Sequence, residues 1–220
     1  MASVNLYGLE RSVYTRIARL ALEEKGVGYT LHETEIFGAG GVSPEHRARQ
    51  PFGRIPAFEH DGFWLYETGA ITRYVDEAWP GPALQPRDGR ERARMNQIVS
   101  LLDSYAYRPM VWSVFVERVG QPLRGRVPDE VKIADGLAAS ERCLGALAAL
   151  AVCQPHLLGA ELTLADLHAY PMLRYLSLAR EGEALLGRYD ALHRWRDRMA
   201  ARPGVQRTRS RYELSSPPVA

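Results

Sequence analysis

The segment from Gln50 to Asp76, QPFGRIPAFEHDGFWLYETGAITRYVD, limits the fold of this chain more than any other part of its sequence. Two short runs of strand-forming residues, 57–60 and 63–66, flank the dipeptide Asp61-Gly62. Asp-Gly between two such runs is typical of the type I′ turn that joins the strands of a β-hairpin. We therefore expect an antiparallel hairpin in the middle of this segment.

The hairpin is expected to lead into a helix that begins with a polar pair. After Tyr66 the apolar residues recur with a period of about 3.6 instead of 2. We expect Thr68 to be the N-cap of this helix, with the carboxylate of Glu67 just outside it. The first backbone N–H groups of a helix have no partner within the helix and favour anions. The pair thus indicates a site suited to a ligand that carries a carboxylate and an ammonium group side by side.

Pro56 marks the start of the first hairpin strand. Proline has no N–H to donate to a strand ladder, and it drives the preceding residue, Ile55, toward an extended backbone. The dipeptide therefore suits a turn into an edge strand, and a cis peptide bond is compatible with it.

This segment resembles the glutathione-binding half of the glutathione S-transferase family. The family pattern is an aromatic-Gly-x-aliphatic-Pro run, a hairpin, and Glu-Ser or Glu-Thr at the start of a helix. Here these motifs are Phe52-Gly53-Arg54-Ile55-Pro56 and Glu67-Thr68. The resemblance is to serine-type members of the phi, theta and zeta kind, including bacterial ones, and it implies a cis bond before Pro56.

The residues before the hairpin complete an α/β domain. Strands are expected at 3–7 and 29–36, with a helix at 12–25 between them. Together with the hairpin and its helix they give the order βαβ–ββα, with a right-handed crossover. This is the thioredoxin-like topology, which we assign to residues 1–79.

The rest of the chain predicts only helices. Residues 80–87 contain three prolines and a glycine, and we interpret them as a linker. Residues 88–220 then form an all-α domain. Its expected helices are 89–118 with a bend at Pro109, 128–151 with Pro128 at N1, one from Thr163 that is interrupted near Pro171, and 184–201; the tail from Ser210 is expected to be irregular.

The third of these helices has a specific start signal. Thr163 is expected as its N-cap and Asp166 at N3, a capping box. The same Thr-x-x-Asp motif after a Leu-Leu-Gly turn, here Leu157-Leu158-Gly159, stands in the helical domain of glutathione S-transferases. The resemblance thus covers about residues 4–205 and implies the glutathione S-transferase fold.

Two residues are candidates for activating the thiol of glutathione. Ser12 stands where the first helix begins, and the run Ser12-Val13-Tyr14-Thr15-Arg16 is similar to the catalytic Ser-x-x-x-Arg run of phi-type and related bacterial transferases. Tyr7, at the end of the first strand, occupies the position used by tyrosine-type classes and is the runner-up. Without the resemblance, Ser12 is an ordinary N-cap.

The resemblance also implies the residues that bind glutathione. Glu67 and Thr68 would hold its γ-glutamyl end, and the backbone of Ile55, shaped by Pro56, would pair with its cysteinyl part. Arg54 would meet the glycyl carboxylate, although the residues alone suggest a solvated arginine. The histidine that phi-type members carry near Gly41 is absent, which argues against a strict phi assignment.

The electrophile is expected between the domains, against the long helix. Aromatic residues at helical spacing are also common in cores, so the same residues have a structural interpretation. The candidates are Tyr105, Tyr107, Arg108, Val111 and Trp112.

Composition excludes several other classes of protein. The net charge of +2 comes from interspersed residues, so a nucleic-acid partner is not expected. No apolar run approaches the roughly 20 residues of a membrane span, and no signal peptide is evident, so we expect a cytoplasmic protein. Cys143 and Cys153 fit neither a redox nor a zinc motif and are expected to be buried thiols, and the six histidines lack ligand spacing, so no metal is implied.

The sequence thus predicts a homodimeric glutathione transferase that uses glutathione as co-substrate and acts on a small apolar electrophile, in the manner of a detoxification enzyme. A glutathione-dependent isomerase or peroxidase on the same site is one alternative. A non-catalytic interaction protein of the same fold is the other, and the presence of Ser12, Pro56, Glu67 and Thr68 together disfavours it.

Overall fold

The computed structural model describes residues 3–214, which form two compact units. Residues 3–83 and 203–214 make the first unit, and residues 84–202 make the second. This division differs from the expected ranges 1–79, 80–87 and 88–220, because the segment from Pro203 onward packs on the first unit. Residues 1, 2 and 215–220 lie outside the described residues.

The first unit is built on a four-stranded sheet with the order β2-β1-β3-β4. β1 is parallel to β2 and antiparallel to β3, and β3 is antiparallel to β4. The predicted βαβ–ββα, thioredoxin-like topology is therefore confirmed. The strands are β1 (Val4–Gly8), β2 (Thr30–Glu33), β3 (Ala57–His60) and β4 (Phe63–Tyr66).

The predicted hairpin is also confirmed, with β3 and β4 at the expected residues. Asp61 and Gly62 both have positive φ, 48° and 86°, as a type I′ turn requires. Asp61 also accepts the backbone N–H of Ser3 at 2.7 Å, so the turn is tied to the start of the chain.

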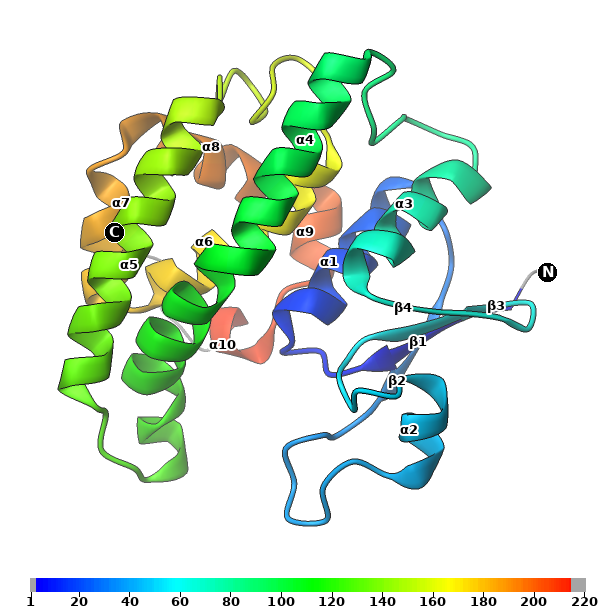
Figure 1. The fold of residues 1–220 in the computed structure, drawn as a ribbon, viewed down its shortest axis with the longest axis horizontal. Helices are drawn as coiled ribbons and strands as arrows, with labels where there is room; N and C mark the ends of the chain where they lie inside the picture. The colour runs from blue at the N-terminus through cyan, green and yellow to red at the C-terminus, as the bar shows by residue number, and fades with distance from the viewer. Residues whose placement is uncertain (1–2, 215–220) are drawn as a thin grey trace. The chain divides into compact units, whose positions relative to one another are not determined.

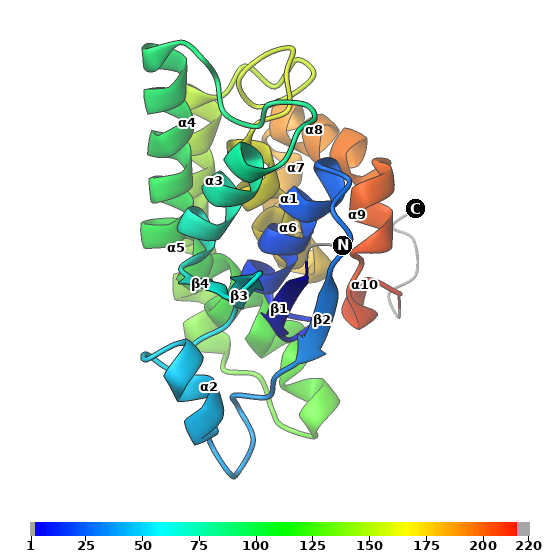
Figure 2. The ribbon, with the colours of Figure 1, turned by 90° about the vertical axis from the view of Figure 1, so that its right-hand side faces the viewer.

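Helices cover both faces of this sheet. α1 (Val13–Glu24) and α3 (Thr68–Ala78) lie on one face, and α2 (Pro44–Arg49) lies on the other (Figures 1 and 2). Leu6 and Phe58 of the sheet and Ile17 and Ile71 of the helices are fully buried. α9 (Pro203–Arg207) packs against α1, and α10 (Arg211–Leu214) replaces part of the tail that was expected to be irregular.

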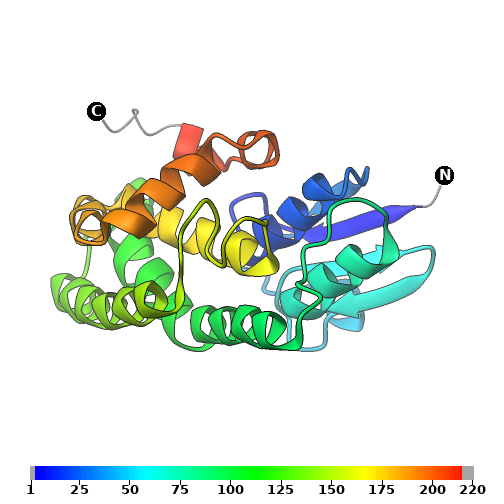
Figure 3. The same ribbon diagram turned by 90° about the horizontal axis from the view of Figure 1, so that it is seen from above.

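The second unit consists of helices around α6. They are α4 (Gly89–Leu101), which continues with π-helical geometry through Leu102–Ala106 and Arg108–Gly120, a 3₁₀ turn at Pro122–Arg124, α5 (Glu130–Leu150), α6 (Leu164–Leu178), α7 (Arg180–Gly187) and α8 (Asp190–Ala200). Figure 3 shows α6 in yellow between the green α4 and the orange α8. None of the helices within residues 3–214 has both the length and the apolar character that a bilayer span needs.

Three expected helix boundaries in this unit are wrong. α6 runs unbroken through Pro171, because nearly every residue of this helix is buried and tertiary packing outweighs the lost hydrogen bond. The single helix expected at 184–201 is two helices that meet after Gly187. α5 begins at Glu130 instead of Pro128, because the Asp129 side chain caps it by accepting the Lys132 N–H at 3.0 Å.

The predicted capping box of α6 is confirmed, and Asp166 in it does more than cap. Its Oδ2 accepts the Thr163 N–H at 2.9 Å, and its Oδ1 accepts both the Leu157 N–H and the Trp195 indole N–H at 2.8 Å. Asp166 and Trp195 are fully buried. One carboxylate thus joins the start of α6, the preceding loop and α8.

We expect Asp166→Ala to destabilise the protein by about 3–5 kcal/mol, because it leaves several buried donors without an acceptor. Thermal unfolding followed by circular dichroism should show a midpoint roughly 10 °C lower. Glu161→Ala, an exposed position in the same loop, should change stability by less than about 0.5 kcal/mol. Equal effects of the two substitutions would contradict this role of Asp166.

Candidate active site

The strand register brings the predicted site residues to one edge of the sheet. Tyr7 pairs with Ala57, and Ala57 pairs with Tyr66. The end of β1, the start of β3 and the end of β4 therefore lie side by side. The loop after β1, the residues before β3 and the residues after β4 carry the predicted site, so all three meet there.

Ser12 lies in the loop between β1 and α1. It is the N-cap of α1, and its Oγ accepts the backbone N–H of Thr15 at 3.3 Å. This bond uses the oxygen of the hydroxyl and leaves the proton available for donation. The side chain is partly exposed, so a ligand can reach it.

Gly8 lets α1 approach the end of β1. A Cβ atom at this position would lie 2.3 Å from Oγ1 of Thr15, which is far shorter than a van der Waals contact. A larger residue here would force the Thr15 side chain, in the first turn of α1, to shift.

Arg11, next to Ser12, forms an ion pair with Glu35 at 2.7 Å. Burial by itself raises the pKa of Glu35, but the hydrogen bonds from Arg11 and from the Phe37 N–H lower it more, so the net pKa lies below its ordinary value. The carboxylate is therefore charged at neutral pH and fixes the Arg11 side chain.

The Tyr7 side chain packs on one face of the sheet, whereas Ser12 lies at the start of the helix that covers the other face. Its ring stacks on those of His32 and Trp64, with centroids 4.6 and 5.5 Å away. The guanidinium carbon of Arg49, in α2, lies 4.2 Å from the centroid of the Tyr7 ring. The ring thus belongs to an aromatic cluster on the α2 side, whereas α1 covers the opposite side.

The dipeptide Ile55-Pro56 has the cis peptide bond that was predicted. The β3 ladder starts at Ala57, so the backbone of Ile55 lies just outside the sheet pairing. The Arg54 side chain is exposed. These positions suit an extended ligand that runs along the start of β3.

Two residues that the sequence analysis missed hold this segment in place. His46 Nε2 lies 2.7 Å from the carbonyl oxygen of Arg54, and Gln50 Oε1 accepts the Arg54 N–H at 3.0 Å. Both are about 1% exposed. No pattern in the sequence marks them beyond their positions six and two residues before Phe52.

Glu67, and not Thr68, is the N-cap of α3, so the predicted cap is wrong by one residue. Glu67 has φ 67° and ψ 114°, and its carbonyl oxygen accepts the N–H groups of Ala70 and Ile71. The left-handed φ turns the chain from β4 directly into the helix, which leaves Thr68 at the first helical position. Positive φ at a residue such as glutamate, outside a tight turn, is strained, and strain of this kind clusters at functional sites.

The N-terminus of α3 can bind an anion. Among the described residues, no side chain caps this helix. Thr68 is 6% exposed and Glu67 is exposed. Uncapped N–H groups, the positive end of the helix dipole and a neighbouring carboxylate therefore lie together.

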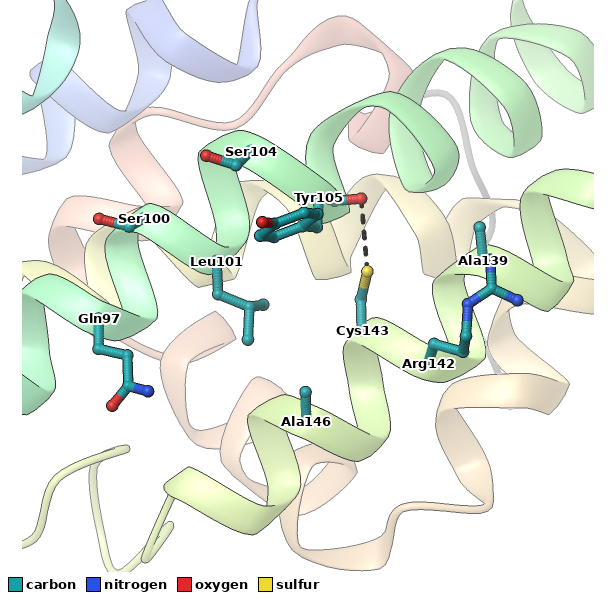
Figure 4. A pocket seen from close by; sticks show the side chains of 9 residues that line it. All are labelled: Gln97, Ser100, Leu101, Ser104, Tyr105, Ala139, Arg142, Cys143 and Ala146. Carbon is teal, nitrogen blue, oxygen red and sulfur yellow. Dashed lines mark hydrogen bonds between the residues drawn. The ribbon is translucent and has the colours of Figure 1, made fainter.

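Of the five predicted electrophile contacts, only Tyr105 lines the cavity found beside the long helix. Tyr105 lines a cavity of about 590 Å³ in the second unit, between α4 with its π-helical continuation and α5, together with Leu101, Cys143 and other residues (Figure 4). Tyr107, Arg108, Val111 and Trp112 do not line that cavity. Val111 is only 5% exposed and belongs to the core, whereas Tyr107 and Trp112 are half-buried and Arg108 is exposed.

Both cysteines are free and buried in the second unit, as expected. Burial raises the pKa of the Cys143 thiol, whose Sγ donates to the carbonyl oxygen of Tyr105 at 3.4 Å. Burial, with help from the charge of Asp166, raises the pKa of Cys153 to about 11. Neither thiol has the lowered pKa of a cysteine nucleophile.

Two models of known protein families match this chain, one in its N-terminal part and one in its C-terminal part. Residues 6–83 match the glutathione S-transferase N-terminal domain, and residues 129–198 match the glutathione S-transferase C-terminal domain. The two matches together span more than half of the chain.

Individual proteins are similar in sequence to this chain over nearly its full length. Glutathione S-transferase 4 of Zea mays is 31% identical over 206 residues, 93% of this chain and 91% of the relative. The probable glutathione S-transferase GSTF1 of Oryza sativa subsp. japonica is 27% identical over 210 residues, 94% and 95% of the two chains.

Solved structures are also similar to the structure of this chain. Glutathione S-transferase III in its apo form has a TM-score of 0.84 at 26% identity and covers 98% of this chain and 100% of its own. Glutathione S-transferase I bound with lactoylglutathione has a TM-score of 0.81 at 25% identity, with 94% and 98% coverage. The chain therefore belongs to the glutathione S-transferase family of enzymes.

Proposed function

We propose that the protein joins the thiolate of glutathione to a small apolar electrophile, and that Ser12 donates a hydrogen bond to the sulfur. The observation that carries this proposal is the geometry of Ser12. Ser12 is partly exposed, and its hydroxyl stands at the N-terminus of α1 and uses only its oxygen in the bond from Thr15. The solved relative bound with lactoylglutathione supports an S-substituted glutathione as ligand of this site.

The chemistry requires glutathione to be a thiolate at neutral pH. A free thiol has a pKa near 8.5, and lowering it by about 2 corresponds to roughly 2.7 kcal/mol. A hydroxyl donor and the positive end of a helix dipole together supply stabilisation of that order. Ser12 combines the two.

Tyr7 is the alternative donor, and its contacts argue against it. To reach a sulfur beside α1, its ring would have to leave the stack with His32 and Trp64 and the guanidinium of Arg49. Ser12 needs no such rearrangement.

Glutathione would lie along the sheet edge. We assign its γ-glutamyl carboxylate to the N-terminus of α3 at Thr68 and its ammonium group to Glu67. The backbone of Ile55, shaped by Pro56, would pair with the cysteinyl part, and the exposed Arg54 would meet the glycyl carboxylate. Tyr107, Arg108, Val111 and Trp112 stay as candidate contacts for the electrophile, as does Tyr105.

We also propose that the protein is a homodimer. Three aromatic side chains at the β3–β4 hairpin and just before it, on the side of the sheet away from α3, are well exposed, from 39% to 68%: Phe52, Trp64 and Tyr66. An exposed cluster of this kind is typical of an interaction surface. A detoxification role and a cytoplasmic location remain predictions from the sequence.

Ser12→Ala should lower turnover with a reactive aryl halide by about 10- to 1000-fold, because losing one donor to an anion costs about 1.5–4 kcal/mol. The apparent pKa of bound glutathione, read from thiolate absorbance, should rise toward the free value. Tyr7→Phe should leave this pKa low. The opposite pattern would transfer the role to Tyr7, and unchanged values in Ser12→Ala would reduce Ser12 to an N-cap.

Glu67→Ala should weaken glutathione binding by about 10- to 100-fold, because it removes the partner of the ligand's ammonium group. Isothermal titration calorimetry measures this directly. Glu77→Ala, at the other end of α3, is the matched control and should bind as the wild type does. A wild-type protein that shows no saturation up to tens of millimolar would overturn the assignment of the whole site.

Phe52→Asp should convert the dimer to a monomer, because a charge in a buried interface is unfavourable. Light scattering coupled to size-exclusion chromatography gives the mass. Val127→Asp, at a valine that is 90% exposed on the second unit, should remain dimeric. A monomeric wild type at high concentration would contradict the proposal.

A further inference from the structure

The last described residues of the chain are attached to the helix that carries Ser12. The guanidinium of Arg16, in α1, pairs with the carboxylate of Glu213, in α10, and the two side chains are 1% and 2% exposed. The same carboxylate accepts the backbone N–H of Ser210 at 3.0 Å and its hydroxyl at 3.3 Å. Residues 203–214, which we call the C-terminal clasp, are thus held at the core of the first unit.

Arg16 links the clasp to Ser12 directly. Its backbone N–H donates to the carbonyl oxygen of Ser12 at 2.9 Å, which is the first hydrogen bond of α1. Its guanidinium also contacts the carbonyl oxygen of Val205, in α9, at 3.4 Å. One side chain therefore joins both helices of the clasp to the first turn of α1.

A second contact reaches the loop itself. The carboxylate of Glu10, two residues before Ser12, accepts the backbone N–H of Arg211 at 2.9 Å. On the other side, the Glu10 N–H donates to the carboxylate of Glu33 at the end of β2, at 3.0 Å. The loop is thus fixed between β2 and the clasp.

We propose that the C-terminal clasp sets the position of the Ser12 hydroxyl, and that Glu10 and Glu213 are positioning residues for activation of the thiol. The inference rests on the proposed role of Ser12. A hydrogen bond weakens steeply with distance and angle, so a donor at the end of a loop is effective only if that loop is held. The clasp supplies this restraint from a part of the sequence about 200 residues away.

The structure offers a matched control for this idea. Arg207 of the clasp also pairs with Glu23 at 2.6 Å, but Glu23 lies in the last turn of α1. Eleven residues separate it from Ser12, about 16 Å along the helix. Removing this contact loosens the clasp at the end of α1 that is remote from the thiol.

The experiment compares Glu10→Ala, Glu10→Gln, Glu213→Gln, Glu23→Ala and Ser12→Ala in the full chain. We expect Glu10→Ala to lower kcat by about 3- to 10-fold and to raise the apparent pKa of bound glutathione by about 0.5 to 1, with KM for glutathione changed by less than about twofold. Glu10→Gln keeps an acceptor for the Arg211 N–H and should restore both values. Glu23→Ala should leave the thiol pKa unchanged.

Glu10 is only partly buried, so its variants should stay folded, which circular dichroism checks. Glu213→Gln removes the negative charge that the buried Arg16 guanidinium pairs with, and it should raise the thiol pKa in the same direction. Adding Glu10→Ala to Ser12→Ala should have no further effect on the thiol pKa, because Glu10 acts through Ser12.

The outcomes separate this inference from the proposed function. A thiol pKa that rises in Ser12→Ala but not in Glu10→Ala or Glu213→Gln would overturn the positioning role and leave the role of Ser12 intact. An unchanged thiol pKa in Ser12→Ala would overturn both. An equal effect of Glu23→Ala and Glu10→Ala would show that the clasp acts only on general stability.

Discussion

The antiparallel pairing of β1 with β3 is the constraint on which the proposed glutathione site depends. Because Tyr7 lies opposite Ala57, the loop that leads to Ser12 begins beside Pro56. The pairing of Ala57 with Tyr66 then places Glu67 and Thr68 at the same edge. A slip of one residue would turn the side chains of a strand to the other face and separate these groups.

Much of the site is made of backbone instead of side chains. The helix ends at Ser12 and Glu67, the cis bond before Pro56 and the left-handed φ of Glu67 are all backbone features. Such a site needs a rigid scaffold, since its polar groups are fixed by the fold and not by rotamers. The buried hydrogen bonds of His46 and Gln50 to the Arg54 backbone serve this purpose.

The sequence predicted those parts that depend on local signals. Asp61-Gly62 specified the hairpin, and Thr163 with Asp166 specified the start of α6, because turns and caps are decided by a few neighbouring residues. It missed what depends on distant contacts. Pro171 is accommodated by packing from several helices, and the attachment of Glu213 to Arg16 joins residues almost 200 positions apart. The cap of α3 was missed for a local reason, because no motif in the sequence indicates the positive φ of Glu67.

The raised pKa values of the two cysteines have a consequence for an enzyme that handles electrophiles. With its pKa raised to about 11 by burial, Cys153 is almost entirely a neutral thiol at pH 7. Burial raises the pKa of Cys143 as well. Alkylation requires the thiolate, so both side chains are poor targets for the compounds that the proposed reaction consumes. We therefore expect the protein to resist alkylation of its own cysteines by the electrophiles that it would consume.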